Sequence, residues 1–358
     1  MTALSDQLDR RFLATSIRMG AQRGGRTWPN PAVGCLVVSR GVVVGRGVTG
    51  NGGTPHGETV ALKQAGHRAQ GATVYVSLEP CNHHGRTPPC SDALVAAGVK
   101  RVVVALGDPD PRVSGSGASA LRQAGITVDV EPFADIKADA ERAHRGHIAR
   151  ILLDRPHVTL KLALSADGAI GAAGQGQIAI TGEQTNRLMH GLRSRMDAIA
   201  VGAGTWRTDK PQLTVRLPGL ERRSPRRVVF GGDDPGTEAW HLPKHTVRSN
   251  LRMLAGSGIG ELLVEGGATL AGLLLRERFV DELLLLKGQG VIGHGAIKPF
   301  DADPFDDLAR AGLSDWTARS KRRVGDDALM VLAPNMVAEA ASPLAEADNP
   351  PRVEIATI

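Results

Sequence analysis

The fold of the first half of the chain is decided by the stretch Glu79-Pro80-Cys81-Asn82-His83-His84-Gly85-Arg86-Thr87-Pro88-Pro89-Cys90. It brings one cysteine to the end of an expected strand and another to the start of an expected helix, and His56-Gly57-Glu58 opens an earlier helix. One imidazole and two thiolates are ligands that zinc prefers, and they leave its fourth tetrahedral position open. The three segments therefore predict a catalytic zinc site.

Glu58 stands two residues after His56, close enough to shuttle a proton without being a ligand. We expect it to accept a proton from water and deliver it to a ring nitrogen and a leaving amine. Nucleobase deaminases carry H-x-E with P-C-x-x-C, whereas here eight residues separate the two cysteines. A structural zinc site with His83 or His84 as fourth ligand, or a buried thiol pair, remains an alternative.

Composition favours a globular enzyme of two domains. The chain has 358 residues, 42% of them apolar and 22% charged, and only three cysteines, which excludes a secreted disulfide framework. No apolar run approaches the roughly 18 residues that span a bilayer, and the opening residues lack a secretory pattern, so we expect a cytoplasmic protein. The net charge of +6 could indicate nucleic acid, but six Phe, four Trp and one Tyr are few for base stacking. An anionic small substrate and a phosphorylated cofactor explain the charge as well.

Alternating strand and helix patterns predict an α/β fold in both halves. The break at Leu153-Asp154-Arg155-Pro156 predicts a domain junction, giving domains over 1–150 and 156–335 and a flexible tail over 336–358. Cys35 is expected to be a small buried hydrophobe, and His67, His144 and His147 to lie at the surface. Expected helices cover 5–24, 56 onward, 89–97, 117–124, 134–150, 183–194, 249–256 and 268–276, and expected strands cover 32–48 (a hairpin), 72–78, 100–106, 126–130, 157–164, 197–201, 227–230, 260–264 and 280–287.

The 79–90 stretch closely resembles the signature of the riboflavin-pathway bifunctional deaminase-reductase family. Pro29-Asn30-Pro31-Ala32-Val33-Gly34 and Gly107-Asp108-Pro109-Asp110-Pro111 also match, and the resemblance runs over about residues 10–335. It implies a cytidine-deaminase-like three-layer α/β/α domain followed by a dihydrofolate-reductase-like α/β domain. It further implies His56, Cys81 and Cys90 as zinc ligands, Glu58 as proton shuttle, and Asn30, His83 and Arg86 as substrate contacts. Thr49 stands where the family often has histidine.

In the second half, no G-x-G-x-x-G directly follows a strand, and Gly115-Ser116-Gly117-Ala118-Ser119-Ala120 only imitates one. A better phosphate site is the strand Glu261 to Val264 leading through Glu265-Gly266-Gly267 into a helix, whose N-terminus favours negative charge. The family resemblance extends here to Lys161-Leu162-Ala163-Leu164-Ser165-Ala166-Asp167-Gly168, Val201-Gly202-Ala203-Gly204-Thr205 and 209–216. Gln177 and Ala179 stand where the family often has Ser and Trp.

The same resemblance implies two residue sets in the second half. Those that would meet NADPH are Ala163, Thr205, Asp209, Gly267, Ala268, Thr269, Leu270, Ala271, Gly272 and Leu273. Those that would meet substrate are Arg193, Leu213, Arg216 and Glu265. Two arginines suit a clamp on a ribose phosphate, because guanidinium pairs bidentately with phosphate oxygens. Their alternative is a pair of solvated surface charges.

The resemblance implies zinc-dependent deamination of 2,5-diamino-6-ribosylamino-4(3H)-pyrimidinone 5′-phosphate and then NADPH-dependent reduction of the ribose to ribityl. Spacing alone indicates only zinc hydrolysis of a planar amine together with nucleotide binding. Two rival hypotheses are a cytidine or tRNA-adenosine deaminase, and a deaminase carrying a non-catalytic binding or assembly domain. We expect a small-molecule pyrimidine nucleotide as the partner, neither nucleic acid nor membrane, and a homo-oligomer.

Overall fold

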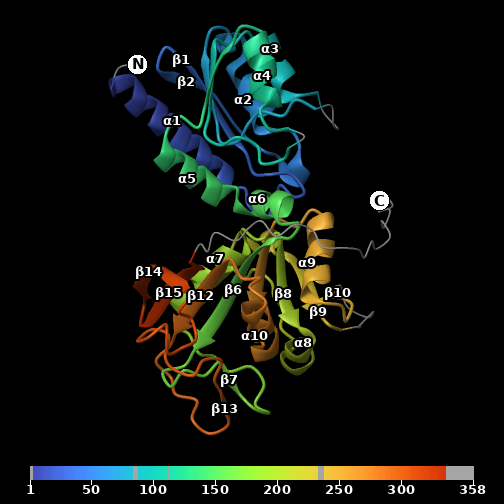
Figure 1. Ribbon diagram of the computed structural model, residues 1–358, viewed down its shortest axis with the longest axis vertical. Coiled ribbons are helices and arrows are strands. Elements are labelled where there is room, and N and C mark those ends of the chain that lie inside the picture. Colours follow the sequence, from blue (N-terminus) through green and yellow to red (C-terminus); the bar gives the residue numbers. More distant parts are fainter. Residues whose placement is uncertain (1–2, 84–87, 112, 233–237, 336–358) are drawn as a thin grey trace.

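The computed structural model describes residues 3–83, 88–111, 113–232 and 238–335, which form an upper and a lower half in Figure 1. The upper half is built on a five-stranded sheet in the order β2-β1-β3-β4-β5. Strand β1 pairs antiparallel with β2 and with β3, while β3, β4 and β5 run parallel. The strands are β1 (Gly34–Ser39), β2 (Val42–Val48), β3 (Thr73–Val76), β4 (Arg101–Val104) and β5 (Thr127–Val130).

Helices cover both faces of this sheet, which gives three layers. On one face α1 packs against β1, β3 and α5, and on the other α2 packs against β2 and β1 and also contacts α3, which contacts α4. Figure 1 shows α1 and α5 on the opposite side of the sheet from α2, α3 and α4. The helices are α1 (Ala3–Ala21), α2 (Gly57–Ala65), α3 (Cys90–Ala96), α4 (Ser116–Gln123) and α5 (Ala134–Ala143).

The lower half is built on an eight-stranded sheet in the order β10-β9-β8-β11-β6-β12-β15-β14. Its first six strands are parallel, and the β14–β15 hairpin adds antiparallel to β12. A small sheet of β7 (Gly171–Ala172) and β13 (Ala296–Ile297) lies apart. The other elements are β6 (His157–Leu164), α7 (Glu183–Arg193), β8 (Ala198–Gly202), α8 (Ala203–Asp209), β9 (Arg226–Phe230), β10 (Trp240–Leu242), α9 (Val247–Gly256), β11 (Glu261–Glu265), α10 (Ala268–Arg276), β12 (Glu282–Lys287), β14 (Trp316–Val324) and β15 (Asp327–Pro334).

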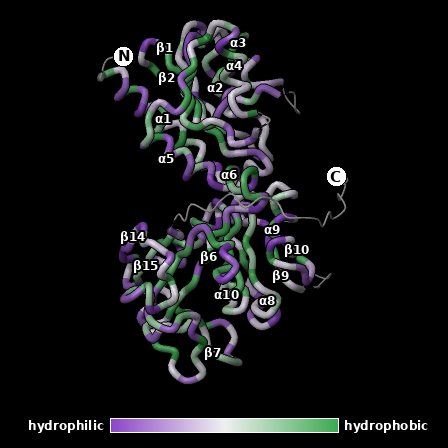
Figure 2. The backbone as a smooth tube through the Cα atoms, in the orientation of Figure 1, coloured by the Kyte–Doolittle hydropathy of each residue, from purple (hydrophilic) through white to green (hydrophobic). Residues whose placement is uncertain are grey.

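Each half has its own apolar core. The β1, β3 and β4 side chains form the centre of one cluster, and those of β6, β8, β11 and β12 form the centre of the other. Hydrophobic residues, whose backbone is green in Figure 2, are concentrated inside both halves. Cys35 is fully buried in the first cluster, as expected for a small hydrophobe. Among the described residues, no helix is long and apolar enough to cross a membrane.

The expectation of one helix over 134–150 is wrong. The backbone leaves helical geometry at His144, where φ is −107°, so that α5 ends at Ala143 and a separate helix, α6 (Arg145–Leu152), follows. Helix α6 lies between the two halves in Figure 1. The expected tail, 336–358, lies outside the described residues.

Candidate active sites

The side chains of His56, Cys81 and Cys90 converge in the first half. Their candidate ligand atoms all lie within 4.8 Å of one another, and no fourth His, Cys, Asp or Glu of the described chain joins the group. The His56 Nδ1 atom is 3.2 Å from Cys90 Sγ and 3.6 Å from Cys81 Sγ. His83 is described and stands outside the cluster, while His84 lies outside the described residues. This donor set fits a zinc ion that keeps one position for another ligand.

Local structure explains how these segments meet. His56 is the N-cap residue of α2, and Cys90 is the first residue of α3. Helix α2 can approach strand β2 closely because Gly47 has no side chain: a Cβ there would stand 2.0 Å from the carbonyl oxygen of Gly57. Cys81 follows β3, and its sulfur accepts a hydrogen bond from the Cys90 backbone N–H at 3.4 Å.

Electrostatics in the cluster favour a thiolate. The hydrogen bond from the Cys90 thiol, with a further one from His56, lowers the pKa of Cys81 to about 4 despite its burial. The pKa of His56 is raised, chiefly by its hydrogen bond with Cys81. Thiolate is the form in which cysteine binds metal, so the cluster is already suited to a cation.

Glu79 holds the loop beside the cluster. Its buried carboxylate accepts hydrogen bonds from the backbone N–H groups of Asp108 at 3.3 Å and of Gly115 and Ala118 at 3.0 Å each. Gly115 is therefore the N-cap of α4 within the first half, and the backbone N–H groups of its glycine-rich stretch are occupied by the Glu79 carboxylate. The glycine-rich segment 115–120, which resembles a dinucleotide motif, therefore has a structural role in binding Glu79.

Glu58 has the environment of a proton carrier. It is 3% exposed, and its Oε2 atom has no hydrogen-bond partner among the described residues. Burial raises the pKa of Glu58 to about 7, although hydrogen bonds and His56 oppose this. A carboxyl with a pKa near neutrality is suited to both accept and donate a proton. Its unpartnered oxygen can form a hydrogen bond with a polar ligand beside the cysteine cluster.

A cavity of about 390 Å³ opens onto this cluster. Asn30 and His83 line it, as do His56, Glu58 and Cys81. Arg86, the third expected substrate contact, lies outside the described residues.

Thr49, which stands where the family often has histidine, is 2% exposed. Its hydroxyl binds the carbonyl oxygen of Pro31 at 3.1 Å and the N–H of Val33 at 3.0 Å. Thr49 thus holds the loop that carries Asn30.

The surface assignment of His144 and His147 is wrong, although His67 is exposed as expected. His144 is 2% exposed and its Nε2 atom is 3.1 Å from Ser77 Oγ. His147 lines the cavity, where its Nε2 atom is 3.2 Å from Asp108 Oδ1. The sequence pattern carries no signal for this, because the partners of the two histidines, Ser77 and Asp108, come from distant segments of the chain.

A second cavity, of about 290 Å³, lies at the carboxyl ends of β8, β9 and β11. Five of the ten expected NADPH residues line it: Thr205, Gly267, Thr269, Leu270 and Leu273. Helix α10 begins at its edge, where free backbone N–H groups favour a phosphate. Asn250, which sequence reasoning missed, also lines it, and its buried Oδ1 atom has no described hydrogen-bond partner. These features fit a dinucleotide, since such ligands bind beyond the carboxyl ends of parallel strands.

The remaining expected NADPH residues do not line this cavity. Ala271 is 1% exposed and packs in the core, so α10 directs it away from any ligand. The other four expected NADPH residues outside this cavity are Ala163 on β6, Asp209 at the end of α8, and Ala268 and Gly272 on α10. Gln177 and Ala179, the two departures from the family pattern, are exposed.

Glu265 ends β11 and is bound by Arg193. The Arg193 Nε and Nη2 atoms are 2.6 and 2.8 Å from the two Glu265 oxygens, and Nη1 donates to the carbonyl of Thr214 at 3.2 Å. Lys161, which sequence reasoning did not single out, has its Nζ atom 3.9 Å from Glu265 Oε2. Burial alone would raise the pKa of Glu265, but Arg193 and Lys161 lower it, so the carboxylate is ionised.

The other two expected substrate residues of the second half differ in exposure. Arg216 is exposed, and its Nη1 atom is 3.2 Å from Gln212 Oε1. Leu213 is 4% exposed and has a φ of +54°. An open clamp of two arginines is therefore not formed, because Arg193 is already engaged by Glu265.

Comparison with known proteins agrees with this arrangement of two sites. Residues 6–106 match the cytidine and deoxycytidylate deaminase zinc-binding region, and residues 156–329 match the RibD C-terminal domain. The riboflavin biosynthesis protein RibD of Escherichia coli (strain K12) is 35% identical over 369 residues, covering 90% of this chain and 99% of that protein. That of Aquifex aeolicus (strain VF5) is 34% identical over 321 residues, covering 81% and 89%.

A solved structure of Acinetobacter baumannii RibD superimposes with a TM-score of 0.82 at 32% identity, covering 92% of this chain and 99% of that one. Fold and site thus define a zinc-dependent deaminase with a cytidine-deaminase-like fold, joined to an NADPH-dependent reductase with a dihydrofolate-reductase-like fold. The chain belongs to the RibD family of bifunctional riboflavin biosynthesis enzymes.

Proposed function

We propose that residues 1–150 deaminate 2,5-diamino-6-ribosylamino-4(3H)-pyrimidinone 5′-phosphate and that residues 156–335 then reduce the ribose of the product to ribityl. The observation that carries the first step is the convergence of His56, Cys81 and Cys90 beside a buried, unpartnered Glu58 oxygen. We assign the three residues as zinc ligands. Bound zinc supplies a Lewis acid that makes water nucleophilic near neutral pH.

In this proposal Glu58 moves the protons of the deamination. It takes a first proton from water at Oε2 and delivers it to the ring nitrogen as water adds. It then takes the second proton from the added hydroxyl and delivers it to the amine, so that ammonia leaves and a carbonyl forms. Asn30 and His83 bind the pyrimidine, and Arg86 binds the phosphate. Burial of the Glu58 side chain keeps it away from bulk water.

The second step uses the cavity at the carboxyl ends of the parallel strands. When bound, NADPH supplies the hydride that reduces the sugar. We assign the phosphates of the dinucleotide to the start of α10, with the expected residues that line the cavity, Thr205, Gly267, Thr269, Leu270 and Leu273, around the ligand. Arg193 orients the Glu265 carboxylate toward the sugar, Leu213 packs beside it and the exposed Arg216 binds the substrate phosphate.

The proposal also includes the cellular location and the oligomeric state. We infer a cytoplasmic enzyme, in keeping with zinc-binding thiols that need a reducing compartment. We also infer a homo-oligomer, which analytical ultracentrifugation of the purified chain would test. The partner of each site is a small-molecule pyrimidine nucleotide.

Glu58→Gln tests the first step. The amide keeps the size of the side chain and leaves all three proposed ligands in place, so the zinc content should remain at one per chain. Ammonia release should fall by about 10²–10⁴-fold, the contribution typical of a general acid–base group. Glu141→Gln, a change of the same kind on α5 outside the cavity, is the matched control and should retain full activity. Equal ammonia release by the two variants would remove Glu58 from the mechanism.

A further inference from the structure

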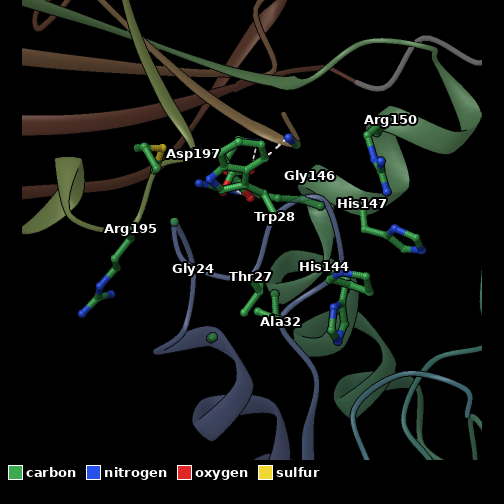
Figure 3. Close-up of a pocket in the computed structure, with 18 of the residues that line it drawn as sticks. Gly24, Thr27, Trp28, Ala32, His144, Gly146, His147, Arg150, Arg195 and Asp197 are labelled. Carbon is green, nitrogen blue, oxygen red and sulfur yellow. Dashed lines mark hydrogen bonds and ion pairs between the residues drawn. The ribbon is translucent and has the colours of Figure 1, made fainter. Parts of the chain in front are cut away.

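The cavity at the cysteine cluster is completed by α6, beyond the 6–106 segment that matches the deaminase zinc-binding region. His147, Arg150 and Ile151 of this helix line the cavity. His147 and Arg150 also line a neighbouring cavity of about 280 Å³ between the two halves, which Figure 3 shows with both side chains labelled on α6. The deaminase cavity therefore extends from the cysteine cluster to the junction of the halves.

The charges along this cavity are unevenly distributed. Among the described residues that line it, Arg150 is the only arginine or lysine, against Glu58, Glu79, Asp108 and Asp110. Glu79 is satisfied by three backbone N–H groups, and Asp108 is paired with His147. Arg150 is thus the one permanently positive side chain among the described residues of this wall.

A pyrimidine nucleotide places its reacting ring and its phosphate at opposite ends of the ribose. With the ring at the cysteine cluster, the phosphate must lie away from it, and a dianion in an acidic cavity needs a cation at that end. We propose that Arg150 binds the 5′-phosphate of the deaminase substrate, while His147 and Asp108 position the ribose between them. This rests on the proposed function and adds a second guanidinium to the one proposed there for the phosphate.

Arg150→Gln tests this when ammonia release is measured on the nucleotide and on the same compound without its phosphate. For the nucleotide, kcat/KM should fall by about 10- to 150-fold, the loss expected for charge-assisted hydrogen bonds to one phosphate. For the dephosphorylated nucleoside it should stay within about twofold of wild type, and Arg150→Lys should restore part of the nucleotide rate. Arg142→Gln, exposed on α5 and lining only the cavity between the halves, is the matched control.

An equal loss on both substrates would show that Arg150 only supports α6, and no loss on either would also overturn the proposal. Should Arg150→Gln fail to fold, inhibition by ribose 5-phosphate provides the second readout. It should compete with the nucleotide in wild type and bind at least about tenfold more weakly to Arg150→Lys, and unchanged inhibition would contradict the assignment. If wild type releases no ammonia from the nucleotide, the proposed function itself fails. This outcome differs from failure of the Arg150 proposal, which is seen only in the comparison of the variants with an active wild type.

Discussion

His144 is buried, and its ionisation makes the free energy of unfolding depend on pH. Burial, with a smaller contribution from His147, lowers its pKa to about 4, whereas the unfolded chain protonates near the ordinary value of 6.5. The stabilisation is therefore complete above about pH 6.5 and is lost as the pH falls toward 4, on the order of 3 kcal/mol in all.

His144→Gln isolates this effect, because the amide can still bond Ser77 but does not titrate. Between pH 7.5 and 4.5 the free energy of unfolding, measured in urea, should fall more steeply for wild type than for the variant. Other buried histidines contribute equally to both proteins. Parallel pH profiles would show that His144 does not remain neutral in the folded state.

Gly267 is the residue on which the cofactor cavity depends for its shape. Its φ is +79°, and a Cβ there would stand 2.8 Å from the Thr205 hydroxyl, which lines the same cavity. Gly267→Ala should weaken NADPH binding by about tenfold or more, since a 1.4 kcal/mol distortion suffices for that. Ammonia release should be unchanged.

Gly272→Ala is the control for this substitution, because no atom lies within 4 Å of a Cβ at that exposed position of α10. Fluorescence titration with NADPH would give both dissociation constants. Equal affinities for Gly267→Ala and Gly272→Ala would place the dinucleotide elsewhere.

Single residues could be predicted from the sequence where the chemistry of a site restricts both the residue types and their positions. His56, Cys81 and Cys90 could be selected because few residue types bind zinc, and because His56 and Cys90 stand at helix starts and Cys81 in the loop after β3. His147, Arg150 and Lys161 could not, because an ordinary charged residue on a helix or strand has the same appearance in sequence whether or not another segment covers it.

Helix α6 connects the two halves through Arg145. Its Nε atom is 3.1 and 3.2 Å from the oxygens of Glu261, and its Nη1 atom is 3.1 Å from Glu282 Oε2, at the starts of β11 and β12. The Arg145 side chain is 27% exposed, so this network is largely shielded from water. Removing the arginine leaves the Glu261 and Glu282 carboxylates without the guanidinium that binds them both.

Arg145→Met should therefore lower the free energy of unfolding by about 3 kcal/mol. The triple variant Arg145→Met, Glu261→Gln, Glu282→Gln should recover part of the loss, because it leaves no unpaired charge. Arg142→Met, exposed on the neighbouring helix, is the control. Calorimetry would compare the four proteins, and identical melting of Arg145→Met and Arg142→Met would show that the network does not join the halves.

Elements with strong local patterns were predicted well. The strand expected over 157–164 is observed as His157–Leu164, and the helix expected over 268–276 as Ala268–Arg276. Strand β14 was missed because it is an exposed edge strand whose polar residues give no alternation, and its apolar partner β15 was missed with it. The break at His144 was missed because it is set by the turn of the chain toward the second half rather than by a glycine or proline.

The two halves meet through close backbone contacts rather than through a loose linker. A Cβ at Gly146 would stand 2.8 Å from the backbone of Gly260, and one at Gly258 would stand 2.5 Å from Pro29. Trp28, from the first half, packs against the apolar cluster of the second. Such contacts could not be read from the sequence, because glycines that permit them look like ordinary loop glycines.

At the scale of the molecule, the order of the two reactions is the central claim, and NADPH oxidation tests it most directly. Supplied with the undeaminated nucleotide, wild type should release ammonia and oxidise NADPH, whereas Glu58→Gln should do neither at an appreciable rate. Supplied with the deaminated nucleotide, both proteins should oxidise NADPH equally. Oxidation of NADPH by Glu58→Gln on the undeaminated nucleotide at the wild-type rate would contradict the account.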